Sequence, residues 1–186
     1  MAIRVTTTSL DGVLIIDTDV WHDARGFFYE SWNAREFAAA GLDVTFVQES
    51  HSRSKRGVLR GIHYQDSTAP LGKLVRCTAG ALFDVAVDLR FGSPTFGRWF
   101  GAELTSDSRR QMYVPAGFGH GFQALADGTE LQYKQTGYYT PAAEGILAWD
   151  DPEVAIHWPI DEVVISDRDR TGMSLAQYVR YPAFRY

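Results

Sequence analysis

Hydrophobic and polar side chains alternate along residues 81–90, which predicts a β-strand. One face of this strand carries Ala81, Phe83, Val85, Val87 and Leu89. The opposite face includes Asp84, Asp88 and Arg90. Because successive side chains of a strand point to opposite faces, we expect one apolar face and one wetter face.

Shorter segments of the same kind run through the rest of the chain. Runs rich in β-branched and aromatic residues predict strands at 13–17, 45–49, 58–65, 74–78, 99–104, 111–114, 122–125 and 131–135. Turn residues separate them at 91–94, 115–117 and 127–128. Seventeen Gly and seven Pro accompany these segments, which is typical of many short strands joined by tight turns.

Helical signals are few. Residues 31–40 read as a helix, with Asn33 able to cap its start and Gly41 placed to end it. A second short helix is predicted at 174–179. Many short strands with peripheral helices favour an all-β sandwich or barrel; the pattern alone does not select which barrel.

The composition is that of an ordinary folded domain. The chain has 186 residues, 45% hydrophobic and 22% charged, so we expect one domain spanning residues 1–186. The formal net charge of −5 argues against a nucleic-acid-binding protein. The first ten residues lack the pattern of a signal peptide, and no segment approaches the ~20 apolar residues of a membrane span. We therefore expect a cytoplasmic protein with no membrane partner, and its single cysteine, Cys77, excludes an internal disulfide.

Two of the five histidines stand in segments that resemble the paired motifs of cupin barrels. Five residues separate Gly57 from His63, and a Pro-x-Gly-x-x-His segment ends at His120. A metal-binding cupin has a second His two residues after the first, where this chain has Gln65. Since two imidazoles are too few ligands for a tight site, we expect no metal. From the residues alone, His63 is either a hydrogen-bonded core imidazole or a base.

Three more residues stand out in predicted strands. Lys73 shares a face with Val75; it either faces inward, where it needs a partner, or is solvated if the register is reversed. Tyr133 suits a buried, hydrogen-bonded tyrosine. Arg60 suits an anion such as a diphosphate, whereas the basic run at 53–56 is typical of a solvated loop.

Several ordered motifs together resemble one family, the dTDP-4-dehydrorhamnose 3,5-epimerases of deoxysugar synthesis. The motifs lie at 23–30, 57–65, 72–76, 83–90, 93–97, 115–122 and 166–169. The first reads Asp-x-Arg-Gly-x-Phe-x-Glu, the second Gly-Val-Leu-Arg-Gly-Ile-His-Tyr-Gln, and the sixth Pro-Ala-Gly-Phe-Gly-His-Gly-Phe. The resemblance spans nearly the whole chain.

This resemblance implies an all-β, cupin-type jelly-roll barrel with a few peripheral helices, assembled as a homodimer. It implies epimerisation of a sugar nucleotide of the dTDP-4-keto-6-deoxyglucose type at carbons 3 and 5. The reaction would proceed by removal and return of protons next to the ketone, without metal or organic cofactor.

The resemblance also implies roles for individual residues. The catalytic set is His63, Lys73, Tyr133, Asp169 and His120. In it, His63 is the base and Asp169 orients it. Lys73 stabilises the enolate oxygen, and Tyr133 returns a proton to the opposite face.

The implied substrate-binding set is Arg25, Phe28, Glu30, Gln48, Ser50, Arg60, Tyr139 and Arg168. The arginines would hold the diphosphate. Phe28, Glu30 and Gln48 would contact the nucleoside, partly across the dimer, and Tyr139 would border the sugar.

One departure and three alternatives stay open. Ser50 stands where the family usually has Asn, so one contact to the base or sugar differs. Relatives that epimerise only carbon 3 or only carbon 5 share most of these motifs. A non-catalytic cupin that binds a sugar nucleotide is the alternative from another class, and Gln65 disfavours a metal-dependent oxygenase.

Overall fold

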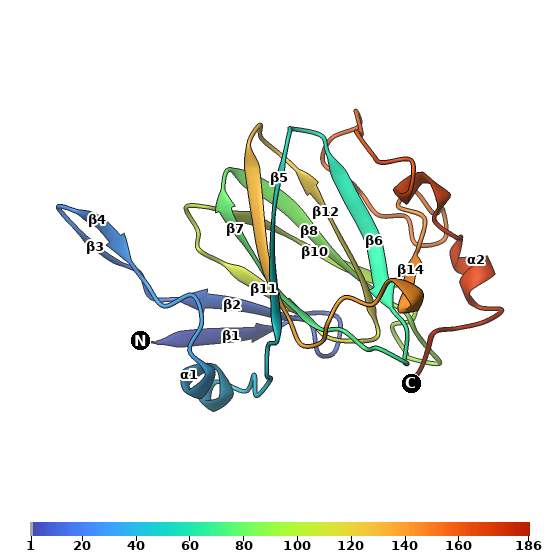
Figure 1. Ribbon diagram of the computed structural model, residues 1–186, viewed down its shortest axis with the longest axis horizontal. Helices are drawn as coiled ribbons and strands as arrows, with labels where there is room; N and C mark the ends of the chain where they lie inside the picture. The colour runs from blue at the N-terminus through green and yellow to red at the C-terminus, as the bar shows by residue number, and fades with distance from the viewer. Residues whose placement is uncertain (1) are drawn as a thin grey trace.

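Residues 2–186 are described by the computed structural model, in which two antiparallel β-sheets face each other (Figure 1). The six-stranded sheet consists of β1 (Ile3–Thr7), β2 (Leu14–Thr18), β11 (Gln111–Val114), β7 (Lys73–Ala79), β13 (Thr129–Gln135) and β5 (Gln48–Ser54), in that spatial order. The five-stranded sheet consists of β10 (Trp99–Thr105), β8 (Ala81–Asp88), β12 (Phe118–Ala124), β6 (Leu59–Gln65) and β14 (Glu144–Ile146). The all-β prediction is confirmed.

Each segment predicted as a strand overlaps a strand of the structure, with two large errors of boundary. The segment predicted at 45–49 is β5, which runs from Gln48 to Ser54 and pairs along its whole length with β13. The strand predicted at 122–125 begins four residues earlier, at Phe118. In the two large sheets the pattern missed β1 and β14, and outside them it missed the short strands at 21–23, 26–28 and 184–185. The sequence of β5, QESHSRS, is polar and shows no apolar alternation, and the strand is stabilised by its pairing with β13.

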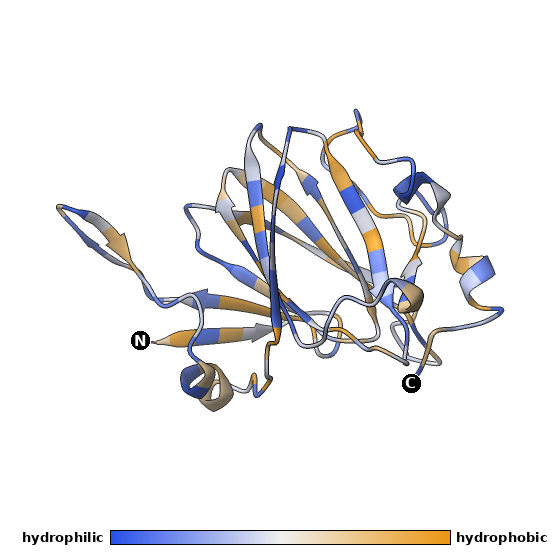
Figure 2. Ribbon diagram, viewed as in Figure 1, coloured by the Kyte–Doolittle hydropathy of each residue, from blue (hydrophilic) through white to orange (hydrophobic). Residues whose placement is uncertain are grey.

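The main core lies between the two sheets. Its buried residues come from both: Val75, Cys77, Leu82, Ala86, Leu104, Met112, Phe118, Phe122 and Leu131 are among them. Figure 2 shows hydrophobic and hydrophilic residues alternating along β6 and β13. Alternate side chains of a strand face opposite sides, and the five-stranded sheet also buries its other face, where Ile62, Val85 and Val87 pack against Leu147, Leu175 and Tyr178.

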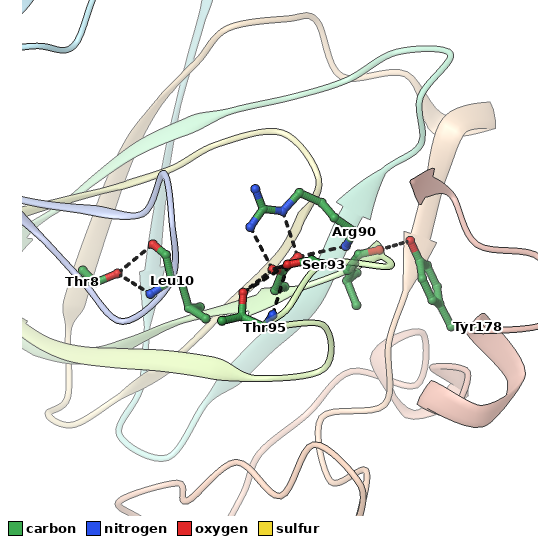
Figure 3. Close-up of polar contacts among 8 residues, drawn as sticks. Thr8, Leu10, Arg90, Ser93, Thr95 and Tyr178 are labelled. Atoms are coloured by element: carbon green, nitrogen blue, oxygen red, sulfur yellow. Dashed lines mark hydrogen bonds and ion pairs between the residues drawn. The ribbon is translucent and has the colours of Figure 1, made fainter. Parts of the chain in front are cut away.

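The face of β8 that was expected to be wetter is buried, so that prediction is wrong. Asp84 and Asp88 are both 0% exposed. The Asp88 carboxylate accepts hydrogen bonds of 2.7 to 2.9 Å from the Arg90 guanidinium and the hydroxyls of Ser93 and Thr95, which converge in Figure 3. Because a buried carboxylate is tolerated when it is paired and hydrogen-bonded, polarity alone did not indicate exposure here.

The helices are short and peripheral (Figure 1). Helix α1 (Ala34–Ala39) is capped by the Asn33 side chain, as predicted, and is followed by Gly41 at φ +100°. Helix α2 (Leu175–Tyr178) lies over β6 and β14, and its Tyr178 hydroxyl donates 2.7 Å to the Leu89 carbonyl (Figure 3). The 3₁₀ turns η1 (Pro141–Ala143) and η2 (Asp169–Thr171) complete the helical elements described.

A two-stranded hairpin projects from the sheets (Figure 1). It pairs β3 (Trp21–Asp23) with β4 (Gly26–Phe28), and the side chains of Trp21 and Phe28 are 49% and 65% exposed. A second small pair joins β9 (Arg90–Phe91) to β15 (Phe184–Arg185). In residues 2–186 no helix has the length and apolar character to span a membrane.

Candidate active site

One cavity of about 400 Å³ gathers most of the predicted site residues. The predicted residues lining it are His63, Lys73, His120, Tyr133, Gln48, Ser50, Arg60, Tyr139 and Arg168. They come from both sheets: β6 and β12 supply the two histidines, and β5, β7 and β13 face them. A ligand in this cavity therefore lies between side chains of opposite sheets.

His63 forms a pair with a carboxylate that is distant in the sequence. Its Nε2 lies 2.7 Å from Oδ1 of Asp169, the first residue of η2, whose Oδ2 accepts from the Gly61 amide at 3.3 Å. Burial raises the pKa of Asp169, but the His63 hydrogen bond, the Gly61 amide and the Arg168 charge outweigh it and lower that pKa. With Asp169 ionised and Nε2–H donating to it, we assign the free lone pair to Nδ1 of His63, as a base requires.

A second chain of contacts ends on the lysine. Nζ of Lys73 lies 3.4 Å from Nδ1 of His120, and Nε2 of His120 lies 2.8 Å from Oδ1 of Asp84. Burial lowers the pKa of His120, against the opposing charge of Asp84. The neutral imidazole thus donates to Asp84 and accepts from Lys73. The buried Asp84 thus holds His120, which in turn contacts Lys73.

Burial also lowers the pKa of Lys73, to about 8, while the charge of Asp84 acts in the opposite direction. The lysine is therefore mainly a cation at neutral pH. Because the Lys73 side chain lines the cavity and contacts His120, Lys73 is on the inward face of its strand, and the alternative of a solvated lysine on a reversed register is excluded. Its Nζ lies 5.8 Å from the centre of the Tyr133 ring. Tyr133, from β13, has no hydrogen-bond partner for its hydroxyl within residues 2–186.

A further group of polar side chains lies beside Lys73 and Tyr133, because Gln135 pairs with Lys73 and Ser50 pairs with Tyr133 across neighbouring strands. The Gln135 Oε1 accepts from Gln48 Nε2 at 3.1 Å and from Ser50 Oγ at 3.2 Å, so the departure at Ser50 belongs to a hydrogen-bonded set. Arg60 and Arg168 are exposed cations on the cavity wall. Their charges suit a ligand that carries negative charge.

Besides Asp169, which pairs with His63 without lining the cavity, three predicted residues lie outside the cavity of the single chain. Arg25 and Phe28 belong to the projecting hairpin, where the Arg25 guanidinium pairs with Asp23 at 2.5 Å. Glu30 follows the hairpin and accepts from Asn33 Nδ2 at 3.3 Å. Their expected contacts across a dimer stay a prediction.

The sequence did not single out three residues that shape the site. Asp84 supports His120, Gln135 joins Gln48 to Ser50, and Glu144 binds both Arg168 and the Tyr139 hydroxyl. Of these three, only Asp84 left a signal in the sequence, as an acidic residue in the middle of the otherwise apolar strand β8.

No three His, Cys, Asp or Glu side chains within residues 2–186 come together as a ligand set for a metal ion. The Gln65 amide, at the position of the cupin metal ligand, bonds instead to main-chain atoms at 2.6 to 3.2 Å. Burial raises the pKa of the Cys77 thiol to about 11, so it stays protonated at neutral pH and is a poor nucleophile.

Comparison with known proteins agrees with this geometry. The family model described as dTDP-4-dehydrorhamnose 3,5-epimerase matches residues 7–177. The dTDP-4-dehydrorhamnose 3,5-epimerase of Pseudomonas aeruginosa is 49% identical over 181 residues, which are 96% of this chain and 99% of that protein. A dTDP-4-dehydrorhamnose 3-epimerase of Streptomyces niveus is 42% identical, over 94% of this chain and 84% of that protein.

Among solved structures, dTDP-6-deoxy-D-glucose-3,5-epimerase of Legionella pneumophila, in complex with dTDP-4-keto-L-rhamnose, has a TM-score of 0.94. It is 42% identical, and the match covers 100% of this chain and 99% of that one. The fold is therefore the cupin-type jelly roll of these proteins. The chain belongs to the dTDP-4-dehydrorhamnose 3,5-epimerase family, and thus to the isomerases.

Proposed function

We propose that this epimerase inverts carbons 3 and 5 of a dTDP-4-keto-6-deoxy sugar of the glucose type, with His63 as the base. The observation that carries this proposal is the His63–Asp169 pair in the same cavity as the Lys73 cation. A proton next to a ketone is weakly acidic, so its removal needs both a base and stabilisation of the resulting enolate oxygen.

The two groups supply these needs separately. Nδ1 of His63 takes the proton, and the ionised Asp169 stabilises the imidazolium that forms. Lys73 then faces negative charge that is absent from the ground state. Loss of one such group costs about 3–4 kcal/mol of transition-state stabilisation in other enzymes.

Inversion also requires an acid on the opposite face of the sugar. His63 comes from the five-stranded sheet and Tyr133 from the six-stranded sheet, and both line the cavity. A sugar ring between them receives a proton from Tyr133 on the face opposite His63. For both carbons to react, the ring must turn or flip between the two steps so that each carbon meets the base.

The remaining contacts divide along the substrate. Arg60 and Arg168 bind the diphosphate, and Gln48 and Ser50 contact the nucleoside. The chain works as one domain, residues 1–186, in the cytoplasm. It forms a homodimer, in which the hairpin residues Arg25 and Phe28, with Glu30, complete the partner's nucleoside site. The exposed aromatic side chains of the hairpin support this arrangement.

The experiment is turnover of dTDP-4-keto-6-deoxyglucose with a 4-ketoreductase and NADPH present to trap the product. We expect the dTDP-L-rhamnose nucleotide. A product inverted at one carbon would identify a mono-epimerase. Nucleotide binding without any inversion would identify a sugar-nucleotide-binding cupin without catalysis.

A further inference from the structure

A buried glutamine of β6 holds the segment that carries Tyr139. Gln65 is 4% exposed. Its Nε2 donates to the carbonyl oxygens of Ala69 and Tyr138 at 2.8 and 3.2 Å, and its Oε1 accepts from the Thr140 amide at 2.6 Å. One side chain thus grips the main chain on both sides of Tyr139. Displacement of this segment would leave the buried Gln65 amide without hydrogen-bond partners, which is energetically costly.

Further hydrogen bonds tie the same segment to the other walls of the cavity. The Tyr139 amide donates to Oε1 of Gln48 at 3.0 Å, and its hydroxyl donates to Oε2 of Glu144 at 2.7 Å. At the start of the segment, the Thr136 amide donates to the Gly72 carbonyl at 3.0 Å, directly before the cavity lysine. In Figure 1 the chain leading into β14 accordingly runs beside β6.

Gln65 is two residues after His63 on the same strand, but it does not line the cavity, whereas Tyr139 does. It therefore cannot contact a substrate in this cavity. We infer that Gln65 is a positioning residue: it fixes Tyr139 at a set place relative to the base and thereby decides where the sugar ring lies. The inference rests on the proposed function, because it assigns Tyr139 to the sugar end of the substrate.

A double-mutant cycle tests whether Gln65 acts through Tyr139. The variants are Gln65→Met, which keeps side-chain length without hydrogen bonds, Tyr139→Ala, and the two combined. We expect Gln65→Met to lower kcat/KM about tenfold when Tyr139 is present and less than about twofold in the Tyr139→Ala background. The dTDP affinity should fall less than kcat/KM in Gln65→Met, because Gln48 keeps its hydrogen bond to Gln135 and Arg60 keeps its hydrogen bond to Ser54. Equal losses in both backgrounds would overturn the inference.

Gln123→Met is the matched control. Gln123 is 0% exposed and also grips one residue of a loop, donating 2.7 Å to the Ile160 carbonyl and accepting 3.0 Å from its amide. It should lower stability as Gln65→Met does, without coupling to Tyr139→Ala. If Gln65→Met does not fold, Gln65→Asn shortens the side chain out of reach of the loop and serves in its place.

A measurement without turnover separates this inference from the proposed function. Amide hydrogen exchange across residues 137–143 should accelerate in Gln65→Met and stay unchanged in Gln123→Met, whether or not the protein acts on the keto sugar. Unchanged exchange in Gln65→Met would show that Gln65 does not hold this segment. Absence of turnover in the wild-type protein, by contrast, would contradict only the proposed function.

Discussion

Lys73 is subject to two opposing influences on its charge. Burial lowers its pKa to about 8, and the Asp84 carboxylate behind His120 limits that decrease. Lys73 is charged below this pKa and neutral above it. Because only the ammonium form stabilises the negative enolate oxygen, Lys73 is effective below this pKa. The charge of Lys73 thus depends on Asp84, which does not line the cavity.

The first prediction is a loss of activity as pH rises through about 8, the pKa of Lys73. Asp84→Asn removes the charge that raises the pKa of Lys73, so the alkaline limb of kcat should move to lower pH. Lys73→Arg, whose guanidinium stays charged, should remove this limb from whatever activity it retains. Stopped assays between pH 6 and 10 measure all three, and an identical limb in the wild-type and Asp84→Asn proteins would contradict the assignment.

Tyr133→Phe should separate proton removal from inversion. The variant lacks the acid but keeps His63 and Lys73, so the substrate should still exchange protons with solvent. Inverted product should form more slowly by about 10²–10⁴-fold, the usual effect of a general acid. Comparing solvent exchange with trapped product checks this, and loss of both to the same extent would argue that Tyr133 only shapes the cavity.

At the scale of elements, the sequence predicts strands whose apolar side chains alternate and fails where other forces hold the strand. The segment 111–114 was placed correctly, because its run of Met, Tyr and Val ends at Pro115. In contrast, β5 is polar along its length, and its bounds follow from pairing with β13. Such long-range pairing leaves no local signal in a polar strand.

Sequence pattern also failed to predict the burial of Asp88, at the end of β8. Buried Asp88 holds Arg90, Ser93 and Thr95 (Figure 3). Asp88→Ala should lower the free energy of unfolding by about 3–5 kcal/mol, because it leaves a largely buried guanidinium without its partner. Urea unfolding midpoints measure this. As a control, Asp17→Ala breaks the more exposed pair with Arg110 and should cost about 0–1 kcal/mol; equal shifts would contradict the account.

The site was predictable only in part from these elements. The pattern put Lys73 on one face with Val75 but left open whether that face points inward, and the cupin spacing singled out His63 and His120. Asp169 approaches His63 through a 3₁₀ turn about a hundred residues later, and only the family resemblance pointed to it. A contact between a strand and a distant turn depends on tertiary packing, which no local pattern records.

At the scale of the molecule, the hairpin is the part least explained by one chain. Its Phe27 ring lies 3.8 Å from the Arg109 guanidinium, and Arg76 donates to the Tyr29 hydroxyl at 2.5 Å, so its base is fixed on the sheet. Residues 21–28 are nevertheless exposed, including Trp21 and Phe28. A hairpin that is fixed at its base and exposes aromatic side chains suits contact with a neighbouring subunit, since aromatic residues often dominate interfaces.

Replacing one exposed aromatic residue of the hairpin tests this assembly. Phe28→Ser should leave the folding stability of the protomer unchanged but lower dTDP affinity at least fivefold, if Phe28 reaches the partner's nucleoside site. Tyr181→Ser, an even more exposed aromatic at 90%, is the matched control and should have no effect. Calorimetry measures affinity, and sedimentation at the same concentration measures mass. Full activity of a monomer would contradict the dimer.

The central claim is that one base, His63, removes protons from both carbons beside the ketone. Its most direct test is NMR of dTDP-4-keto-6-deoxyglucose in deuterated water with the wild-type protein and with His63→Asn. We predict loss of the proton signals at carbons 3 and 5 with the wild-type protein. With His63→Asn, both exchanges should slow by about 10²–10⁴-fold while dTDP affinity is retained. Exchange at either carbon that continues at the wild-type rate in His63→Asn would contradict the claim.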